Sequence, residues 1–391
     1  MSIVFHWFLP TNGDGRRLVE PEQPVPGVAG GQRPATLDYL TQIASAAENL
    51  GIEGALTPTG PWCDDAWVTT AALAQRTHRL KFIVAFRPGM MSPTLSAQMA
   101  ATYQLHTGGR LILNVVTGGD SAEQHMYGDW LDKEGRYERC GEFLEIVRRL
   151  WTGEVVDLDG SHLHVEGAAL GRQPDPVPPL YFGGSSPAAL KVAAAHTDVY
   201  LTWGEPPAQV AEKLDRVRAE AAALGRTMRF GIRLHVVSRD RSEDAWAAAD
   251  ALLDGISDEE IAKVHARMAT TESEGQQRML ALHGGSRANL EVAPNLWAGV
   301  GLARGGAGTA LVGSHEEVAD RIEEYAALGI DEFVLSGYPH LEELYWFGEG
   351  VLPLLERRGA WKRPVASAAG MRTSTLGSGG VSFGVVPRPE R

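Results

Sequence analysis

The sequence predicts an α/β fold of the (β/α)8 type, a TIM barrel with insertions, and three observations support this. Eight apolar, strand-like segments recur along the chain, and nearly all of them are followed by a helical pattern. The chain has 391 residues, a length that single α/β barrels reach once insertions are counted. The alternative is a doubly wound sheet, which is weakened because no GxGxxG motif follows the first strand.

The expected strands are short segments rich in β-branched and aromatic residues. They lie at residues 3–9, 54–57, 80–86, 111–116, 180–182, 199–203, 230–237 and 333–335. Helices are expected at 36–50, which is amphipathic, and at 64–77, which opens with two acids. Ser92 and Pro93 supply an N-cap and a first-turn proline, and SHEE at 314–317 is a capping box that starts a further helix.

Two stretches interrupt the first half of this repeat. Residues 11–34 form a long loop rich in Gly and Pro, at the end of the barrel where active sites are built. A hairpin is expected within about residues 153–178, because VVDLDGSHLHVE alternates around an Asp-Gly turn. His162 and His164 share a face of this hairpin, but no third ligand is nearby in sequence, so we expect no metal site.

The second half carries one large insertion. Residues 255–308, after the seventh strand, are helical, then polar and Gly-rich, which predicts a mobile lid with hinges at Gly305, Gly306 and Gly308. Residues 366–391 are rich in Gly, Ser and Pro, and we expect a flexible tail. The domain organisation expected is therefore one barrel over residues 1–365, followed by this tail.

Composition excludes several classes of partner. Hydrophobic residues make up 44% of the chain and charged residues 22%, which is ample for a core. The formal net charge of −13 argues against a nucleic acid or an anionic membrane as partner. Cys63 and Cys140 are the two cysteines, so no disulfide framework exists, and the N-terminus lacks a basic segment typical of signal peptides. We expect a soluble, cytoplasmic protein.

The strand-like sequence RFGIRLHVVSR at 229–239 carries two polar residues in an apolar context. Arg233 and His235 are two apart, so they point to the same face of a strand. A buried guanidinium is tolerated when an anion or a carboxylate meets it. Two interpretations stay open from this segment alone, a functional site and a structural ion pair with a core carboxylate.

Chemically active side chains follow the other predicted strands, at the end where barrel enzymes hold their sites. In chain order they are Asn12, Cys63, Arg87, Asn114 with Thr117, Ser185 with Ser186, Trp203, Arg233 with His235, and Tyr338 with His340. The sequence GGSSP at 183–187 suits a phosphate site, because glycines allow close approach and the helix starting at Pro187 presents free N–H groups. An ordinary capped βα turn is the alternative for this loop.

Several strings resemble the FMN-dependent alkanesulfonate monooxygenases, within the bacterial-luciferase-like group, over about residues 1–358. These strings are FHWFLPTNGDGR, NVVTGGD, PPLYFGGSS, YLTWGEPP, RFGIRLHV, NLWAGVGLARGGAGTALVG and GIDEFVLSGYPHLEE. The resemblance implies a two-component enzyme, in which a separate NAD(P)H-dependent reductase supplies reduced FMN. It also implies that the barrel uses O2 to cleave the C–S bond of an alkanesulfonate, giving an aldehyde and sulfite, and that the chain forms a dimer or tetramer.

The resemblance also implies roles for individual residues. Cys63 lies in a CxDAW motif near the flavin, Ser185 and Ser186 hold the FMN phosphate, and Tyr137 in the RYE motif is a second phosphate contact. Asn114 and Thr117 are expected to bind the cofactor. The residues that match the family's active-site positions are Trp203, Arg233, His235, Arg304, Tyr338 and His340.

Residue chemistry agrees with this interpretation. The planar guanidinium groups of Arg233 and Arg304 suit a sulfonate, and His235 and Tyr338 are candidates for proton transfer. The chain departs from the family at Asn12, where many members have His, and in its longer first loop, which leaves the preferred chain length open. Alternatives are a relative acting on methanesulfonate or a sulfone, a deazaflavin-dependent oxidoreductase on the same barrel, and a non-enzymatic flavin-storage or sulfonate-binding protein.

Overall fold

Eight parallel strands close into a barrel, as the sequence predicts. The computed structural model describes residues 2–18 and 33–364, and each barrel strand pairs with the next in space, the last with the first. The barrel strands in order are β1 (Val4–Phe8), β2 (Gly54–Thr57), β3 (Lys81–Phe86), β4 (Leu111–Val115), β7 (Leu180–Phe182), β8 (Val199–Trp203), β9 (Arg229–Arg239) and β13 (Glu332–Ser336). This closed order excludes the doubly wound alternative.

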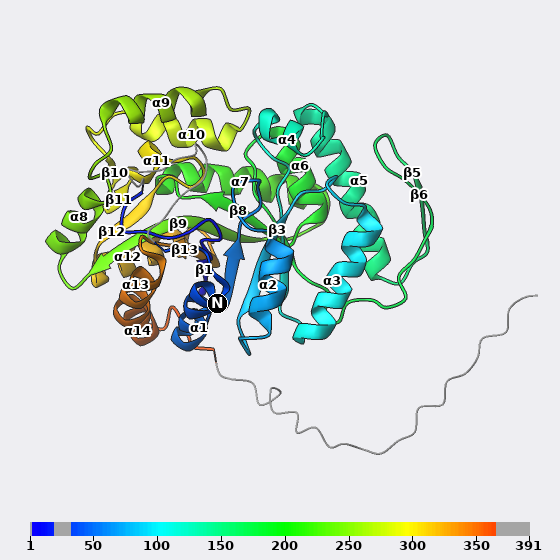
Figure 1. Ribbon diagram of the computed structural model, residues 1–391, viewed down its shortest axis with the longest axis horizontal. Coiled ribbons are helices and arrows are strands. Elements are labelled where there is room, and N and C mark those ends of the chain that lie inside the picture. The colour runs from blue at the N-terminus through cyan, green and yellow to red at the C-terminus, as the bar shows by residue number, and fades with distance from the viewer. Residues whose placement is uncertain (1, 19–32, 365–391) are drawn as a thin grey trace, which may run out of the picture.

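Helices cover the outside of the barrel (Figure 1). They are α1 (Leu37–Leu50), α2 (Ala66–Ala74), α3 (Pro93–Thr107), α5 (Lys133–Trp151), α6 (Pro187–His196), α7 (Pro207–Ala223), α8 (Ser242–Ala251), α12 (His315–Ala327), α13 (His340–Trp346) and α14 (Leu352–Arg357), the last two joined by a π-helical turn. Ser92 caps α3 through the backbone N–H of Leu95, and Ser314 with Glu317 forms the expected capping box of α12. The predicted helix starts are thus confirmed.

The sequence did not reveal β12 (Ala310–Ser314). This strand pairs in parallel with the second half of β9, while the first half of β9 pairs with β8. β9 is 11 residues long because it pairs first with β8 and then with β12 along the same edge. The short apolar run of β12 follows a Gly-rich segment, and it is not among the strands expected from the sequence.

The segments expected to be insertions contain the following elements. β5 (Val156–Asp159) and β6 (His164–Ala168) make the hairpin, in which His164 contacts Asp159 and His162 contacts Glu138. The predicted lid contains α9 (Asp258–Ala269), α10 (Glu274–His283), the short strands β10 (Glu291–Ala293) and β11 (Leu296–Trp297), and α11 (Val300–Ala303). Figure 1 shows these elements gathered at the end of the barrel toward which the strands run, with α4 (Ser121–Met126) at the same end.

Alternating residues of the strands divide the core into two layers. One set fills the barrel interior, and the other packs against the helices; the interior set is Phe8, Leu56, Ile83, Ile112, Tyr181, Val199, Leu201 and Val334. Glu332 lies buried at the amino-terminal end of β13, where it accepts hydrogen bonds from Tyr181 and Arg229 and contacts Nε2 of His6 at 3.0 Å. This polar cluster is expected to serve stability, because it lies opposite the working end of the barrel.

None of the described helices combines the length and hydropathy that a membrane-spanning segment needs. The middle of the first loop, residues 19–32, and the expected tail, residues 366–391, lie outside the described residues.

Candidate functional site

Arg233 is buried near the middle of β9 without an acidic partner among the described residues. Its guanidinium donates to the carbonyl oxygen of Leu234 at 2.7 Å and to Oγ of Ser336 at 2.9 Å, and its Cζ lies 4.8 Å from the centre of the Phe8 ring. No carboxylate of the described residues forms an ion pair with it. Burial and the nearby charge of Arg304 lower the pKa of Arg233 to about 9. A structural ion pair therefore does not account for this buried cation, and an anionic ligand would.

Ser336 joins Arg233 to His235. Its Oγ lies 2.7 Å from Nδ1 of His235, and Nε2 of that ring lies 3.0 Å from the carbonyl oxygen of Ala307. A carbonyl oxygen can only accept, so Nε2 carries the hydrogen and Nδ1 accepts from Ser336. Burial, followed by Arg233 and Arg304, holds the pKa of His235 well below its ordinary value. Arg233 and His235 thus share a face, as predicted, and His235 is neutral with both nitrogens engaged.

Tyr338 and Arg304 complete this side of the site. The Arg304 guanidinium donates to the hydroxyl oxygen of Tyr338, and the Tyr338 ring stacks on His235 with centres 5.5 Å apart. Arg304 directly follows α11 of the predicted lid and precedes Gly305 and Gly306. The structure therefore brings the lid arginine to the two strand residues that the sequence singled out.

His340 binds a carboxylate that the sequence analysis did not select. Nδ1 of His340 lies 3.0 Å from Oδ1 of Asp14, and the His340 backbone N–H donates to Oδ2 of Asp14 at 2.9 Å. Tyr39 also donates to this carboxylate, and both Asp14 and His340 are buried. Burial raises the pKa of Asp14, but His340 and the hydrogen bond from Tyr39 outweigh it and lower the pKa overall. The sequence signal was the NGDG turn, which places a carboxylate in the loop after the first strand.

The loop at 183–187 forms a cradle with little room for side chains. A Cβ on Gly183 would lie 2.8 Å from the carbonyl oxygen of Leu201, and one on Gly184 would lie 2.7 Å from Cβ of Ala189. The Tyr137 hydroxyl is 3.5 Å from the position of that second Cβ, so Tyr137 reaches this loop from α5. Ser186 caps α6 by accepting from the N–H of Ala189. The loop is thus both the capped turn and a cradle with serine and tyrosine hydroxyls around it.

The lid packs against the same cradle. A Cβ on Gly275, in the first turn of α10, would lie 3.4 Å from the Trp203 ring and 3.6 Å from Oγ of Ser185. Arg278 of α10 makes two hydrogen bonds to the buried carboxylate of Glu205, at the end of β8. α10 of the predicted lid therefore lies against Trp203 and Ser185, and the ion pair between Arg278 and Glu205 holds it there.

A further contact holds the loop between α9 and α10. Arg136 of α5 donates to the Glu272 carboxylate at 2.9 Å. Neither Glu205 nor Glu272 was selected from the sequence, because the arginine that each one binds, Arg278 or Arg136, lies more than 70 residues away.

A second group of predicted residues lies across the ends of β2, β3 and β4. The Cys63 thiol donates to the carbonyl oxygen of Gly60, and burial raises its pKa to about 11, so it stays a thiol at neutral pH. Arg87 pairs with Glu123 at 2.7 Å, while its Nε and Nη1 are buried without a hydrogen-bond partner among the described residues.

The three predicted amide and hydroxyl residues of the working end follow their strands as expected. Asn114 and Thr117 lie at and just beyond the end of β4, and Asn12 lies in the turn after β1. They mark the rim of the barrel mouth on the side of β1 to β4.

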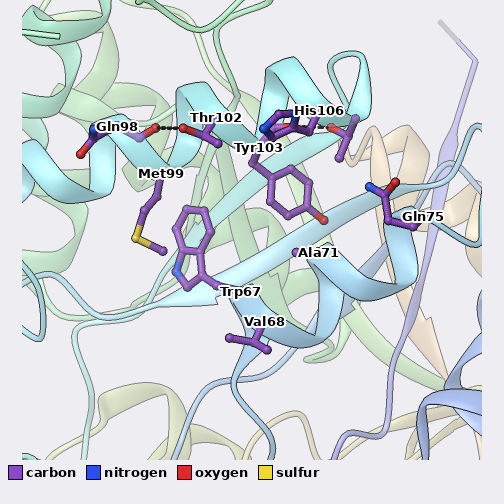
Figure 2. Close-up of a pocket in the computed structure, with 10 residues that line it drawn as sticks. Trp67, Val68, Ala71, Gln75, Gln98, Met99, Thr102, Tyr103 and His106 are labelled. Carbon is purple, nitrogen blue, oxygen red and sulfur yellow. Dashed lines mark hydrogen bonds between the residues drawn. The ribbon is translucent and has the colours of Figure 1, made fainter. Parts of the chain in front are cut away.

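One hollow among the described residues lies elsewhere. It measures about 570 Å³ and lies on the outside of the barrel between α2 and α3, where Trp67, Val68, Met99 and Tyr103 line it (Figure 2). It contains none of the residues above, so it is not the chemical site. The candidate site is the cluster at the carboxyl ends of the strands.

Comparisons with known proteins give the family. The chain resembles solved structures of a riboflavin lyase (22% identity, 93% of each chain covered, TM-score 0.76) and of the EDTA monooxygenase from Chelativorans sp. BNC1 (19% identity, 93% of this chain and 96% of that chain, TM-score 0.72). It also resembles a long-chain alkane monooxygenase (20% identity, 93% of each chain, TM-score 0.72). These identities are low, and the likeness shows the shared fold. Residues 3–332 match the family model described as luciferase-like monooxygenase, and the chain belongs to the luciferase-like monooxygenase family.

Proposed function

We propose that this chain is the oxygenase of a two-component system that uses reduced FMN and O2 to cleave the C–S bond of an alkanesulfonate, giving an aldehyde and sulfite. The observation that carries the substrate class is Arg233, a buried cation without a carboxylate among the described residues. A sulfonate is anionic at every physiological pH, and its oxygens suit the planar guanidinium. A variant of this proposal is that the enzyme acts on methanesulfonate or on a sulfone. A panel of substrates distinguishes these cases.

The residues present fit FMN. The cradle at Gly183 and Gly184 leaves space that a Cβ would fill, and the hydroxyls of Ser185, Ser186 and Tyr137 surround it, as a phosphate needs. Further polar atoms at the same end of the barrel are buried without a hydrogen-bond partner in the described part of the chain, which suits a polar ring edge. They are Oγ1 of Thr11, Oγ1 of Thr57, Nε and Nη1 of Arg87, and Nε2 of Gln124.

Each side chain then has a physical task. FMN, when bound and reduced, supplies two electrons to the reaction of O2 with the substrate. Arg233 and Arg304 bind the sulfonate oxygens, and Trp203 lies beside the phosphate cradle, where its ring can pack against the flavin. The lid over Trp203 and Ser185 keeps water from the reacting atoms.

The proposal includes a separate NAD(P)H-dependent FMN reductase, because the chain lacks a dinucleotide-binding motif after its first strand. A homo-oligomer, dimer or tetramer, and a cytoplasmic location belong to the same proposal. The test is sulfite release across a panel of sulfonates with O2, FMN, NADH and an added FMN reductase. We expect sulfite with the reductase and none with NADH alone. Reduction of FMN by NADH without the reductase, or preferential binding of a reduced deazaflavin, would overturn the proposal.

The phosphate cradle gives one prediction. Replacing Ser185 and Ser186 together by alanine is expected to weaken the binding of reduced FMN by at least tenfold, while riboflavin binding changes little, because riboflavin lacks the phosphate. Anaerobic titrations with both flavins measure this difference. Equal weakening of the two flavins would place the phosphate elsewhere.

Arg304 of the lid gives a second prediction. Arg304→Ala removes the contact with Tyr338 and a sulfonate ligand, so sulfite formation should fall by at least tenfold while oxidation of reduced FMN continues and releases hydrogen peroxide. Parallel assays of O2, sulfite and peroxide measure this uncoupling. Arg287→Ala is the control, because Arg287 also lies in the lid but pairs with the exposed Asp258. Normal coupling in Arg304→Ala would contradict the role of the lid.

A further inference from the structure

The buried pair of Asp14 and His340 has the geometry of an oriented base. Asp14 accepts from three groups besides the His340 ring: the N–H of Gly15, the N–H of His340 and the Tyr39 hydroxyl. Because the pKa of Asp14 is lowered, it is a carboxylate at neutral pH, and it accepts a hydrogen from Nδ1 of His340. In neutral His340 the free lone pair is therefore on Nε2.

Nε2 of His340 is buried and has no hydrogen-bond partner within the described ranges, and the histidine side chain as a whole is only 2% exposed. The His340 ring lies 5.8 Å from the Phe8 ring, and the Arg233 guanidinium carbon lies 4.8 Å from that same Phe8 ring. On another side, the Tyr338 ring is 5.1 Å from His340. The free nitrogen therefore belongs to the cluster that is proposed to hold the sulfonate.

We propose that His340 is the catalytic base that removes a proton from the carbon next to sulfur, and that Asp14 is the residue that positions it. The inference rests on the proposed function, whose balance requires such a base. A CH2 group bonded to sulfur becomes an aldehyde CH, so one C–H bond breaks and its hydrogen leaves as a proton. The C–S electron pair leaves with sulfite, one oxygen of O2 enters the aldehyde, and the other leaves as water with the two hydrogens of reduced FMN.

The other titratable groups of the cluster are less suited to accept this proton. Both nitrogens of His235 are engaged, Nδ1 by Ser336 and Nε2 by Ala307, and Arg233 and Arg304 disfavour its protonation. The Tyr338 hydroxyl accepts a hydrogen bond from Arg304. Asp14 is the one carboxylate of the described residues that contacts His340, and Tyr39, which binds Asp14, stays protonated because burial and Asp14 raise its pKa.

Nuclear magnetic resonance tests the dyad without substrate or flavin. In the intact, ¹⁵N-labelled protein, we expect one of the 12 histidines to show a protonated Nδ1 and an unprotonated Nε2 at neutral pH. This signal should disappear in His340→Gln and change in Asp14→Asn. A His340 that carries its hydrogen on Nε2 at neutral pH would overturn the proposal.

Kinetics test the role of the base. With an added FMN reductase, His340→Gln is expected to lower the rate of sulfite release by roughly 100-fold or more. Asp14→Asn should lower it less and should change the pH profile of the rate, because the His340 ring loses the carboxylate that orients it. A substrate with both hydrogens next to sulfur replaced by deuterium should show a larger isotope effect in Asp14→Asn than in the natural sequence.

Asp320→Asn is the control, because Asp320 also pairs with an arginine, Arg358, but lies exposed on α12. We expect the natural rate and pH profile in this variant, and circular dichroism confirms that each variant is folded. Absence of sulfite from the natural sequence would overturn the proposed function. Sulfite from the natural sequence, with an unchanged rate and pH profile in folded His340→Gln and Asp14→Asn, would overturn the role of the dyad alone.

Discussion

Arg233→Ala is expected to reduce sulfite formation by roughly 30-fold to several thousand-fold, the range seen when one partner of a buried charge pair is removed. Its thermal stability should stay unchanged or rise slightly. The reason is that Arg233 forms no ion pair with any described carboxylate, and burial lowers its pKa to about 9, so its charge costs free energy in the folded protein. Sulfite assays and thermal melts on the same preparation measure both effects.

Arg239→Ala is the matched control for Arg233→Ala. Arg239 lies on the same strand and makes two hydrogen bonds to the carboxylate of Glu343, which is 2% exposed. Removing Arg239 leaves that carboxylate uncompensated, so we expect a loss of about 3 to 5 kcal/mol in the free energy of unfolding with specific activity retained. If Arg233→Ala instead lost stability like Arg239→Ala and kept its activity, Arg233 would be structural and the site would be misplaced.

Arg233→Lys separates the contribution of the positive charge to activity from that of the planar guanidinium geometry. Lysine keeps the positive charge but offers a single ammonium in place of the planar guanidinium. A small part of the activity should remain, since the ammonium can still bind one sulfonate oxygen. The same sulfite assay measures it.

The fold could be predicted from the sequence because local signals define its elements. The predicted strand at 199–203 agrees with β8, and the residues proposed as caps at Ser92 and Ser314 accept the expected N–H groups. β12 was missed because its five residues lack a distinguishing period and follow a Gly-rich segment.

From the sequence, the candidate site could be predicted only where a single residue is unusual in its local context. Arg233 and His235 were selected because a polar residue in an apolar strand is costly. Ser336 and Asp14 were missed, because a serine or an aspartate beside a strand end is common, and their importance arises from partners far away in sequence. Ser336 meets His235 across 101 residues, and Asp14 meets His340 across 326.

These contacts also change one expectation. The sequence alone suggested His235 for proton transfer, since it shares a face with Arg233. In the structure His235 donates to the carbonyl oxygen of Ala307 and accepts from Ser336, which leaves neither nitrogen free. We therefore expect His235 to hold Arg233 and the lid segment in place, and His340 to accept the proton.

Glu332→Gln is expected to have a large effect on stability, at the opposite end of the barrel. Glu332 is 1% exposed and contacts His6, Tyr181 and Arg229. Burial raises its pKa, but His6, Arg229 and Tyr181 outweigh this and lower it below 4.5. The neutral amide cannot compensate the charge of Arg229, and its NH2 group would face the donors around it. We expect a loss of about 3 kcal/mol in the free energy of unfolding.

The pH dependence of stability checks the sign of this argument. A carboxyl group whose pKa is lowered on folding contributes its full stabilisation above its unfolded value, here near 4.5, and loses it as the pH falls through the lower folded value. The difference in stability between the natural sequence and Glu332→Gln should therefore be constant above pH 5 and shrink at lower pH. Denaturant titrations between pH 3 and 7 measure it, with sulfite release by the folded variant as the control. If the difference in stability between the two proteins grew on acidification, Glu332 would be protonated in the folded protein. This end of the barrel would then be stabilised by the hydrogen bonds of a neutral carboxylic acid, and not by the charge of a carboxylate.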